Sequence, residues 1–224
     1  MIEPLKITRD TIETGQLEEF LANVEKQGLL IRSSPEYRNK TRKQAISQFN
    51  QTEDIWLFAY GSLLWNPTIT YKEVQVAHLF GFHRRFCLKT ILGRGTPECP
   101  GLMLALDRGG SCKGVAYRIS REIAEHELKI IWNREMVSNS YVAKVVRLKT
   151  KTSPLKAITF AMNRKDNKYS GRLSTIDTAN IIARSRGPLG SSRDYLFETI
   201  DKLTEYGIMD SHLNKLAKLI KDQS

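Results

Sequence analysis

The chain has 224 residues, of which 41% are apolar and 26% are charged. This composition is typical of a globular protein and excludes a disordered, fibrous or disulfide-stapled chain. The length predicts one domain with an appendage rather than two full domains. The longest apolar runs, such as residues 55–60 and 102–106, are far shorter than the ~18 residues that cross a bilayer. We therefore expect no membrane span and, because the first ten residues lack a secretory apolar segment, a cytoplasmic location.

Lys and Arg outnumber Asp and Glu by 35 to 24, which gives a formal charge of +11. Such an excess raises the question of a nucleic-acid partner. However, no basic stretch is interleaved with the aromatic side chains that stack on bases, so we interpret the charge as a solvated surface and expect no nucleic-acid partner. The 3 cysteines and 4 histidines show no paired metal-ligand spacing. Neither a metal site nor a disulfide framework is predicted.

Residues 1–53 are expected to form a helical extension. Apolar residues recur at helical spacing over 17–24, Gly28 follows where a helix C-cap belongs, and Ser34-Pro35 is typical of a second helix start. After Asp54 the character of the sequence changes. The apolar run 55–60 predicts a buried strand, and the compact domain is therefore expected to span residues 54–224.

The rest of the chain alternates between strand and helix patterns. Strands are expected at 102–106 and 114–119, joined by a hairpin turn at 107–110, and at 142–148 and 156–162. Helices are expected at 121–136, 177–186, 192–206 and 211–221. These elements predict an α+β fold with a strand-rich centre.

One of these helices carries an anomalous carboxylate. Ala124, Leu128 and Ile131 form an apolar stripe, and the next position on that face is Glu135. A carboxylate at the end of a buried stripe is partly desolvated, which raises its pKa and suits a proton carrier. The alternative is that Glu135 only forms an ion pair, for example with Arg134. Helix geometry alone favours the ion pair.

Two loops could also belong to a site. The predicted strand at 55–60 ends in Tyr60-Gly61-Ser62-Leu63, where a Gly-Ser turn can direct backbone N–H groups at an anion or oxyanion. The segment 94–101 (RGTPECPG) is dense in proline and glycine, which favours a rigid loop. Each could equally be structural, as a plain chain reversal or an Ω-type loop.

Taken in order, these segments form a pattern. They are WLFAYGSLLWNP at 56–67, GFHRRFC at 81–87, RGTPECPG at 94–101, GVAYRI at 114–119, REM at 134–136, GPLGS at 187–191 and GIMDSHL at 207–213. The succession resembles the ChaC-like gamma-glutamylcyclotransferase family, in particular its glutathione-specific bacterial form with an N-terminal extension. The resemblance covers roughly residues 54–216.

The resemblance implies a small mixed β-barrel with helices packed outside. It also implies cleavage of the gamma-glutamyl amide of glutathione to 5-oxoproline and cysteinylglycine, without a metal or organic cofactor. The substrate-binding turn then corresponds to Tyr60, Gly61, Ser62 and Leu63, and the catalytic glutamate to Glu135. Tyr141 and Arg94 are taken as further substrate-binding residues.

The sequence leaves open the loop at residues 136–140, the substrate and whether the barrel is catalytic. Many family members have one or two glycines in the segment that corresponds to residues 136–140. Asn139 can adopt a left-handed turn almost as glycine does, so we expect this loop to keep its shape. Other gamma-glutamyl amino acids or amines are an alternative substrate class. A non-catalytic basic barrel that binds a small anion is a second alternative. The sequence does not indicate an oligomeric state.

Overall fold

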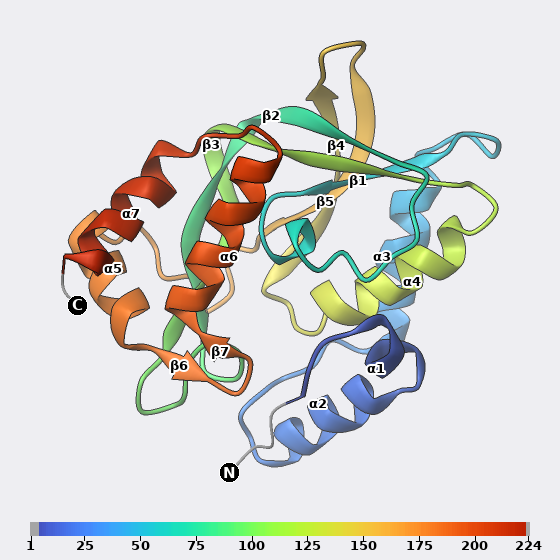
Figure 1. The fold of residues 1–224 in the computed structure, drawn as a ribbon. Helices are drawn as coiled ribbons and strands as arrows, with labels where there is room; N and C mark the ends of the chain where they lie inside the picture. The colour runs from blue at the N-terminus through green and yellow to red at the C-terminus, as the bar shows by residue number, and fades with distance from the viewer. Residues whose placement is uncertain (1–4, 223–224) are drawn as a thin grey trace.

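Five strands form a closed barrel in the computed structural model, which describes residues 5–222 (Figure 1). They are β1 (Ile55–Ala59), β2 (Glu73–Thr90), β3 (Gly101–Ile119), β4 (Tyr141–Lys149) and β5 (Leu155–Met162). Their order around the barrel is β1-β3-β2-β4-β5. The barrel is mixed, because β5 pairs in parallel with β1 and β3 while the other neighbours are antiparallel. The predicted α+β fold with a small mixed barrel is confirmed.

The predicted hairpin at 107–110 is wrong. Residues 101–119 form the single strand β3, which pairs along its length with β2, a strand that the sequence analysis did not predict. Gly81 of β2 and Gly109 and Gly110 of β3 have positive φ and lie opposite one another at a register shift. These glycines resemble a turn in sequence, but here they form an irregularity that bends a continuous strand pair.

Four helices follow β3 along the chain. They are α4 (Ala124–Glu135), α5 (Thr175–Arg184), α6 (Ser192–Glu205) and α7 (Ser211–Lys221). All four were predicted, with ends that differ by at most three residues. A short pair of strands, β6 (Arg186–Gly187) and β7 (Gly190–Ser191), separates α5 from α6. In Figure 1, α5, α6 and α7 lie together on one side of the barrel, away from α4.

Three helices precede the barrel, α1 (Arg9–Glu13), α2 (Gln16–Lys26) and α3 (Pro35–Ile46), and they lie near α4 (Figure 1). The two predicted helices are present. Gly28 has a φ of 72° and ends α2, and the Ser34 hydroxyl caps α3 by accepting the N–H of Tyr37. Ala45 of α3 packs into the barrel core. The boundary between residues 53 and 54 therefore stays a prediction.

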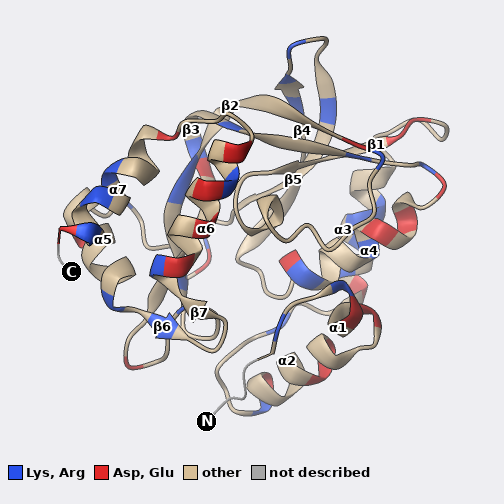
Figure 2. Ribbon diagram, in the orientation of Figure 1, with Lys and Arg blue, Asp and Glu red and all other residues tan. Residues whose placement is uncertain are grey.

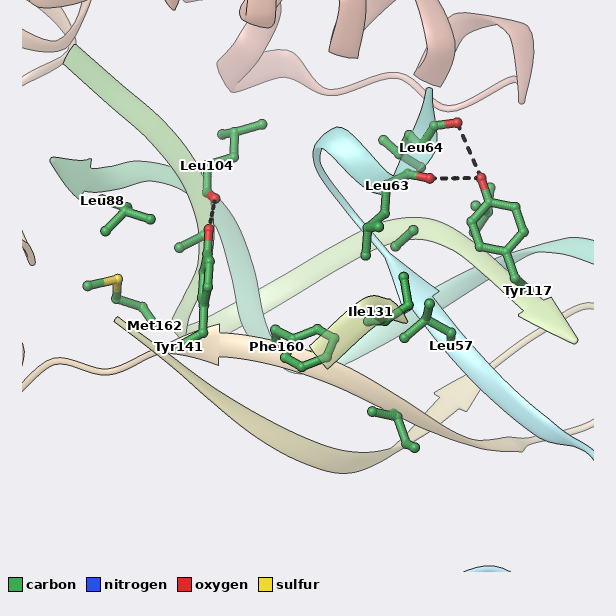
Figure 3. Packing of buried hydrophobic residues seen from close by; sticks show 14 of the residues in the cluster. Leu57, Leu63, Leu64, Leu88, Leu104, Tyr117, Ile131, Tyr141, Phe160 and Met162 are labelled. Atoms are coloured by element: carbon green, nitrogen blue, oxygen red, sulfur yellow. Dashed lines mark hydrogen bonds between the residues drawn. The ribbon is translucent and has the colours of Figure 1, made fainter. Parts of the chain in front are cut away.

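The main core lies between the barrel and the helices. Its largest fully buried side chain is Trp132 of α4, whose ring packs edge-on against Phe160 of β5 with centroids 5.1 Å apart. Figure 3 shows Phe160, Leu57 and Ile131 from three different elements gathered in this core. Each such side chain contributes about 1.5–3 kcal/mol on burial, so the apolar stripe of α4 holds this helix firmly against the barrel.

Basic residues are spread over the fold. Figure 2 shows Lys and Arg scattered along many elements, with Asp and Glu among them. Among residues 5–222, no helix is both long and apolar enough to cross a membrane.

Candidate active site

The turn after β1 is held in place by backbone contacts. The chain leaves β1 at Tyr60-Gly61 and enters a single 3₁₀ turn, η1 (Ser62–Leu64), closed by a 2.8 Å bond from the N–H of Leu64 to the carbonyl of Gly61. The Tyr117 hydroxyl lies 3.1 Å from the carbonyl of Leu63, to which it donates (Figure 3). Because these backbone groups are satisfied, the turn has a fixed shape.

Gly61 is required by a close approach. A Cβ atom at this position would lie 2.8 Å from the hydroxyl oxygen of Tyr195, a buried residue of α6. The backbone N–H of Ser62 lies near the same hydroxyl and partly opposes the rise in its pKa that burial causes. A phenol that accepts one hydrogen bond can still donate its own proton. Tyr195 therefore brings a donor to the turn.

Glu135 is the last residue of α4 and lies beside this turn. Its side chain is 12% exposed, and one carboxylate oxygen lies 3.1 Å from Nε of Arg134. Arg134 also donates from Nη2 to the hydroxyl of Ser62 at 3.0 Å, so one guanidinium joins the carboxylate to the turn. Burial raises the pKa of Glu135, and Arg134 opposes this with a smaller effect. The carboxylate is thus both ion-paired and desolvated, which combines the two interpretations of the sequence.

Three buried tyrosines lie within the electrostatic influence of the carboxylate. Burial, together with the negative charge of Glu135, raises the pKa of Tyr60 and Tyr141 above the ordinary value and that of Tyr195 to about 12. All three are therefore neutral phenols near pH 7. Tyr60 donates to the carbonyl of Phe160 at 2.8 Å. Tyr141 donates to the carbonyl of Leu104 at 3.0 Å, as Figure 3 shows. These bonds hold the side chains of Tyr60 and Tyr141 in place. Together with Tyr195 they are called the tyrosine wall below.

Arg94 reaches the site from the loop between β2 and β3. Its guanidinium carbon lies 5.4 Å from the ring centroid of Tyr195 and 5.8 Å from that of Trp65, while Nη1 donates to the carbonyl of Ser191. The loop itself is tightly packed, since a Cβ on Gly95 would meet backbone atoms at 2.1 Å. The loop therefore has a defined structure that carries a buried cation to Tyr195.

The structure brings most of the candidate residues together. Glu135, Tyr60, Tyr141 and the turn are neighbours, and Arg94 joins them through Tyr195. The Leu63 side chain instead packs into the hydrophobic core, so this residue contributes its backbone to the turn.

Sequence reasoning missed Tyr195 and the bridging role of Arg134. The sequence indicates Arg134 only as an ion-pair partner of Glu135, whereas its guanidinium also donates to the Ser62 hydroxyl. Asn139 does not use the left-handed conformation that is open to it. Among the described residues, Thr68 is the only non-glycine with positive φ, and the loop is held instead by a 2.8 Å bond from the Asn163 amide to the carbonyl of Asn139.

Metal ligands do not gather in the part of the chain that the structure describes. Within residues 5–222, no three His, Cys, Asp or Glu side chains lie close enough to hold a metal ion together. The side chains that do converge are one carboxylate, two guanidiniums and three phenols. Such a set can bind the ends of a small zwitterionic or anionic molecule and can move a proton.

The chain is similar to a known family of proteins. The profile of the family described as ChaC-like protein matches residues 55–223. A glutathione-specific gamma-glutamylcyclotransferase of Escherichia coli K12 is 35% identical over 216 residues, covering 96% of this chain and 92% of the relative. A mouse glutathione-specific gamma-glutamylcyclotransferase 1 is 31% identical, covering 74% and 78%.

Solved structures show the same fold. A crystal structure of a yeast gamma-glutamyl cyclotransferase specific to glutathione superimposes with a TM-score of 0.69 at 23% identity, covering 75% of this chain and 96% of the yeast chain. This barrel therefore has the gamma-glutamyl cyclotransferase type of fold. The chain belongs to the ChaC-like family.

Proposed function

We propose that this protein is an enzyme that cleaves the gamma-glutamyl amide of glutathione and releases 5-oxoproline and cysteinylglycine. The observation that carries this proposal is the desolvated carboxylate of Glu135 beside the turn at residues 60–63. The nearly full-length relative with a glutathione-specific name supports the choice of substrate.

Positioning is the first task of the site. The α-amino nitrogen of the substrate attacks its own γ-carbonyl carbon, a new C–N bond closes a five-membered ring, and the amide bond to cysteinylglycine breaks. Nucleophile and electrophile belong to one molecule, so the enzyme needs only to hold a folded conformer. Well-oriented intramolecular reactions reach effective molarities of about 10⁵–10⁸ M. The fixed turn and the tyrosine wall supply surfaces for that purpose.

Proton transfer is the second task, and we assign it to Glu135. The α-ammonium group must lose a proton before it attacks, and the departing nitrogen must gain one. A single carboxylate with a raised pKa can serve as base and then as acid. Because Arg134 contacts both Glu135 and Ser62, it can keep the carboxylate aligned with a substrate bound at the turn.

Stabilisation of developing charge is the third task. Negative charge builds on the γ-carbonyl oxygen, and hydrogen-bond donors aimed at that oxygen lower the barrier. The N–H of Ser62 lies near the Tyr195 hydroxyl, so both groups can donate to one bound oxyanion or carboxylate. Tyr195 and the turn therefore form one donor group, which serves either the oxyanion or the substrate α-carboxylate.

Two alternatives make different predictions. A cyclotransferase for other gamma-glutamyl amino acids or amines would use the same carboxylate and turn with a different leaving group. A non-catalytic barrel would bind a small anion and need no base with a raised pKa. The direction of the pKa shift of Glu135 favours an enzyme over the non-catalytic barrel.

We expect the purified protein to convert reduced glutathione to 5-oxoproline, with the same rate in the presence of EDTA. The check is mass spectrometry of the products, with gamma-glutamyl-alanine and gamma-glutamyl-lysine as parallel substrates. Efficient cleavage of either of these without action on glutathione would favour the broader cyclotransferase. No turnover of any of the three would favour the non-catalytic barrel.

We further propose a cytoplasmic enzyme without a nucleic-acid partner. The three cysteines, Cys87, Cys99 and Cys112, are free thiols, as is usual in a reducing compartment. The scattered basic residues provide solubility and attract an anionic tripeptide. We therefore expect no sub-micromolar binding to DNA or RNA oligonucleotides at physiological salt, as measured by fluorescence anisotropy. Such binding would contradict this part of the proposal.

A further inference from the structure

The helix that carries Glu135 is bound along its whole length by the chain that precedes the barrel. Near its start, Arg9 of α1 donates two hydrogen bonds of 2.7 and 2.9 Å to the carboxylate of Glu127. The Glu127 side chain is only 3% exposed. In its last turn, the indole N–H of Trp132 donates to the Thr41 hydroxyl of α3 at 3.0 Å. The extension therefore contacts α4 on more than one turn.

Apolar packing joins the same two parts of the chain. Ile130 of α4 is buried in a cluster with Leu17, Leu21 and Val24 of α2, and Val137, just beyond α4, packs against that cluster. This cluster is separate from the barrel core. One face of α4 thus packs on the barrel while another packs on the extension.

The end of α4 is the critical point. The last carbonyl groups of a helix have no partner within the helix and need one from elsewhere. The carbonyl of Met136, the residue that follows Glu135, accepts a hydrogen bond from the hydroxyl of Ser33. The backbone N–H of Ser33 donates to the carbonyl of Val137 at 2.9 Å. Ser33 is 5% exposed, so water does not readily replace these bonds.

We infer that the N-terminal extension is a clamp for the catalytic helix and that Ser33 is its positioning residue. Ser33 binds the carbonyl groups of the two residues that follow Glu135, and so fixes where the carboxylate lies relative to the turn at residues 60–63. This inference rests on the proposed function, because it needs Glu135 to be the proton carrier. It gives the extension a role in turnover in addition to a role in folding.

Removal of the Ser33 hydroxyl should lower kcat and leave KM nearly unchanged. In Ser33→Ala the Met136 carbonyl loses its partner, the end of α4 loosens, and Glu135 no longer keeps one position. A misplacement of about 1 Å can cost up to ~10²-fold in rate, so we expect a 10- to 100-fold lower kcat. We expect KM to stay within about twofold, since the turn and the tyrosines are unchanged. The looser end also admits water, so the apparent pKa in the pH profile of kcat should fall towards ~4.3.

The neighbouring serine provides a matched control. The Ser34 hydroxyl caps α3 by accepting the N–H of Tyr37 at 3.1 Å. Ser34→Ala therefore removes one serine hydroxyl of the same extension, and it should leave kcat and its pH profile unchanged. Ser33→Thr keeps the hydroxyl at the clamp and should restore most of the lost kcat. If Ser33→Ala does not fold, Ser33→Cys keeps the volume with a much weaker donor and replaces it in the comparison.

The outcomes separate this inference from the proposed function. A folded Ser33→Ala or Ser33→Cys variant with wild-type kcat and pH profile overturns the clamp, even if Glu135→Gln is inactive. An equal loss of kcat in Ser34→Ala also overturns it, because the effect would then be general weakening of the extension. Full activity of Glu135→Gln instead removes the proposed mechanism on which the clamp depends.

Discussion

Glu135→Gln should lower kcat by about 10² to 10⁴, because that range is the usual contribution of a positioned general base. The amide keeps the size of the side chain and can still accept a hydrogen bond from Arg134, but it cannot take a proton near neutrality. Glutathione should still bind, since the turn at residues 60–63 and the tyrosine wall are unchanged. The measurement is steady-state kinetics with glutathione, together with calorimetric titration of the variant.

The pH profile of the wild type gives a second readout of the same carboxylate. Burial raises the pKa of Glu135, and the base is the ionised form. The kcat should therefore be lost as the pH falls through an apparent pKa above the ~4.3 of free glutamate, and Glu135→Gln should lack this step. Glu122→Gln makes the same chemical change at an exposed position and serves as the control. Near-normal turnover by a folded Glu135→Gln variant would remove Glu135 from the mechanism.

Gly61→Ala should lower kcat/KM by about 10²-fold through a steric effect. The added Cβ would lie 2.8 Å from the Tyr195 hydroxyl, so either the turn or the tyrosine must move. Tyr195 is buried in the core, and the turn is bonded to Tyr117, so neither group can move freely. A shift of about 1 Å in either would misplace the substrate relative to Glu135.

A double-mutant cycle separates this clash from a general defect. Tyr195→Phe removes the oxygen that the new Cβ would meet, and the next neighbour, Cβ of Leu104, lies at a comfortable 3.7 Å. Tyr195→Phe should lower activity in the wild-type background because the site loses the hydroxyl donor beside the turn, yet it should recover part of the activity of Gly61→Ala. If the activity losses of the two single variants simply add in the double variant, the clash between the new Cβ and the Tyr195 hydroxyl is not the cause of the Gly61→Ala defect.

The parts of the site that the sequence predicts are those with a local signal. The continuous apolar run at 55–60 ends in a Gly-Ser turn, and β1 is found there. The stripe that ends in Glu135 identifies a carboxylate near the core because helical spacing alone places it on the buried face. In both cases a few neighbouring residues contain all the information that the prediction needs.

The parts that the sequence does not predict depend on distant partners. Strand β2 was missed because charged residues interrupt its apolar pattern. Arg84 in its middle is nevertheless buried, since Nη1 lies 2.6 Å from the carboxylate of Asp210 and Nη2 lies 2.6 Å from the carbonyl of Lys113. Tyr195 lies on α6, far along the chain from the turn, and periodicity does not distinguish it from any other buried tyrosine. Such residues become visible only when the fold brings their partners together.

One experiment tests the central claim, intramolecular cyclisation of glutathione. The wild-type protein is incubated with glutathione in water enriched in ¹⁸O, and the products are analysed by mass spectrometry. If the α-amine of the substrate attacks its γ-carbonyl, the product is 5-oxoproline without ¹⁸O, because no water enters the reaction. Release of glutamate that carries ¹⁸O would show that water is the nucleophile and would contradict the cyclotransferase mechanism proposed for this chain.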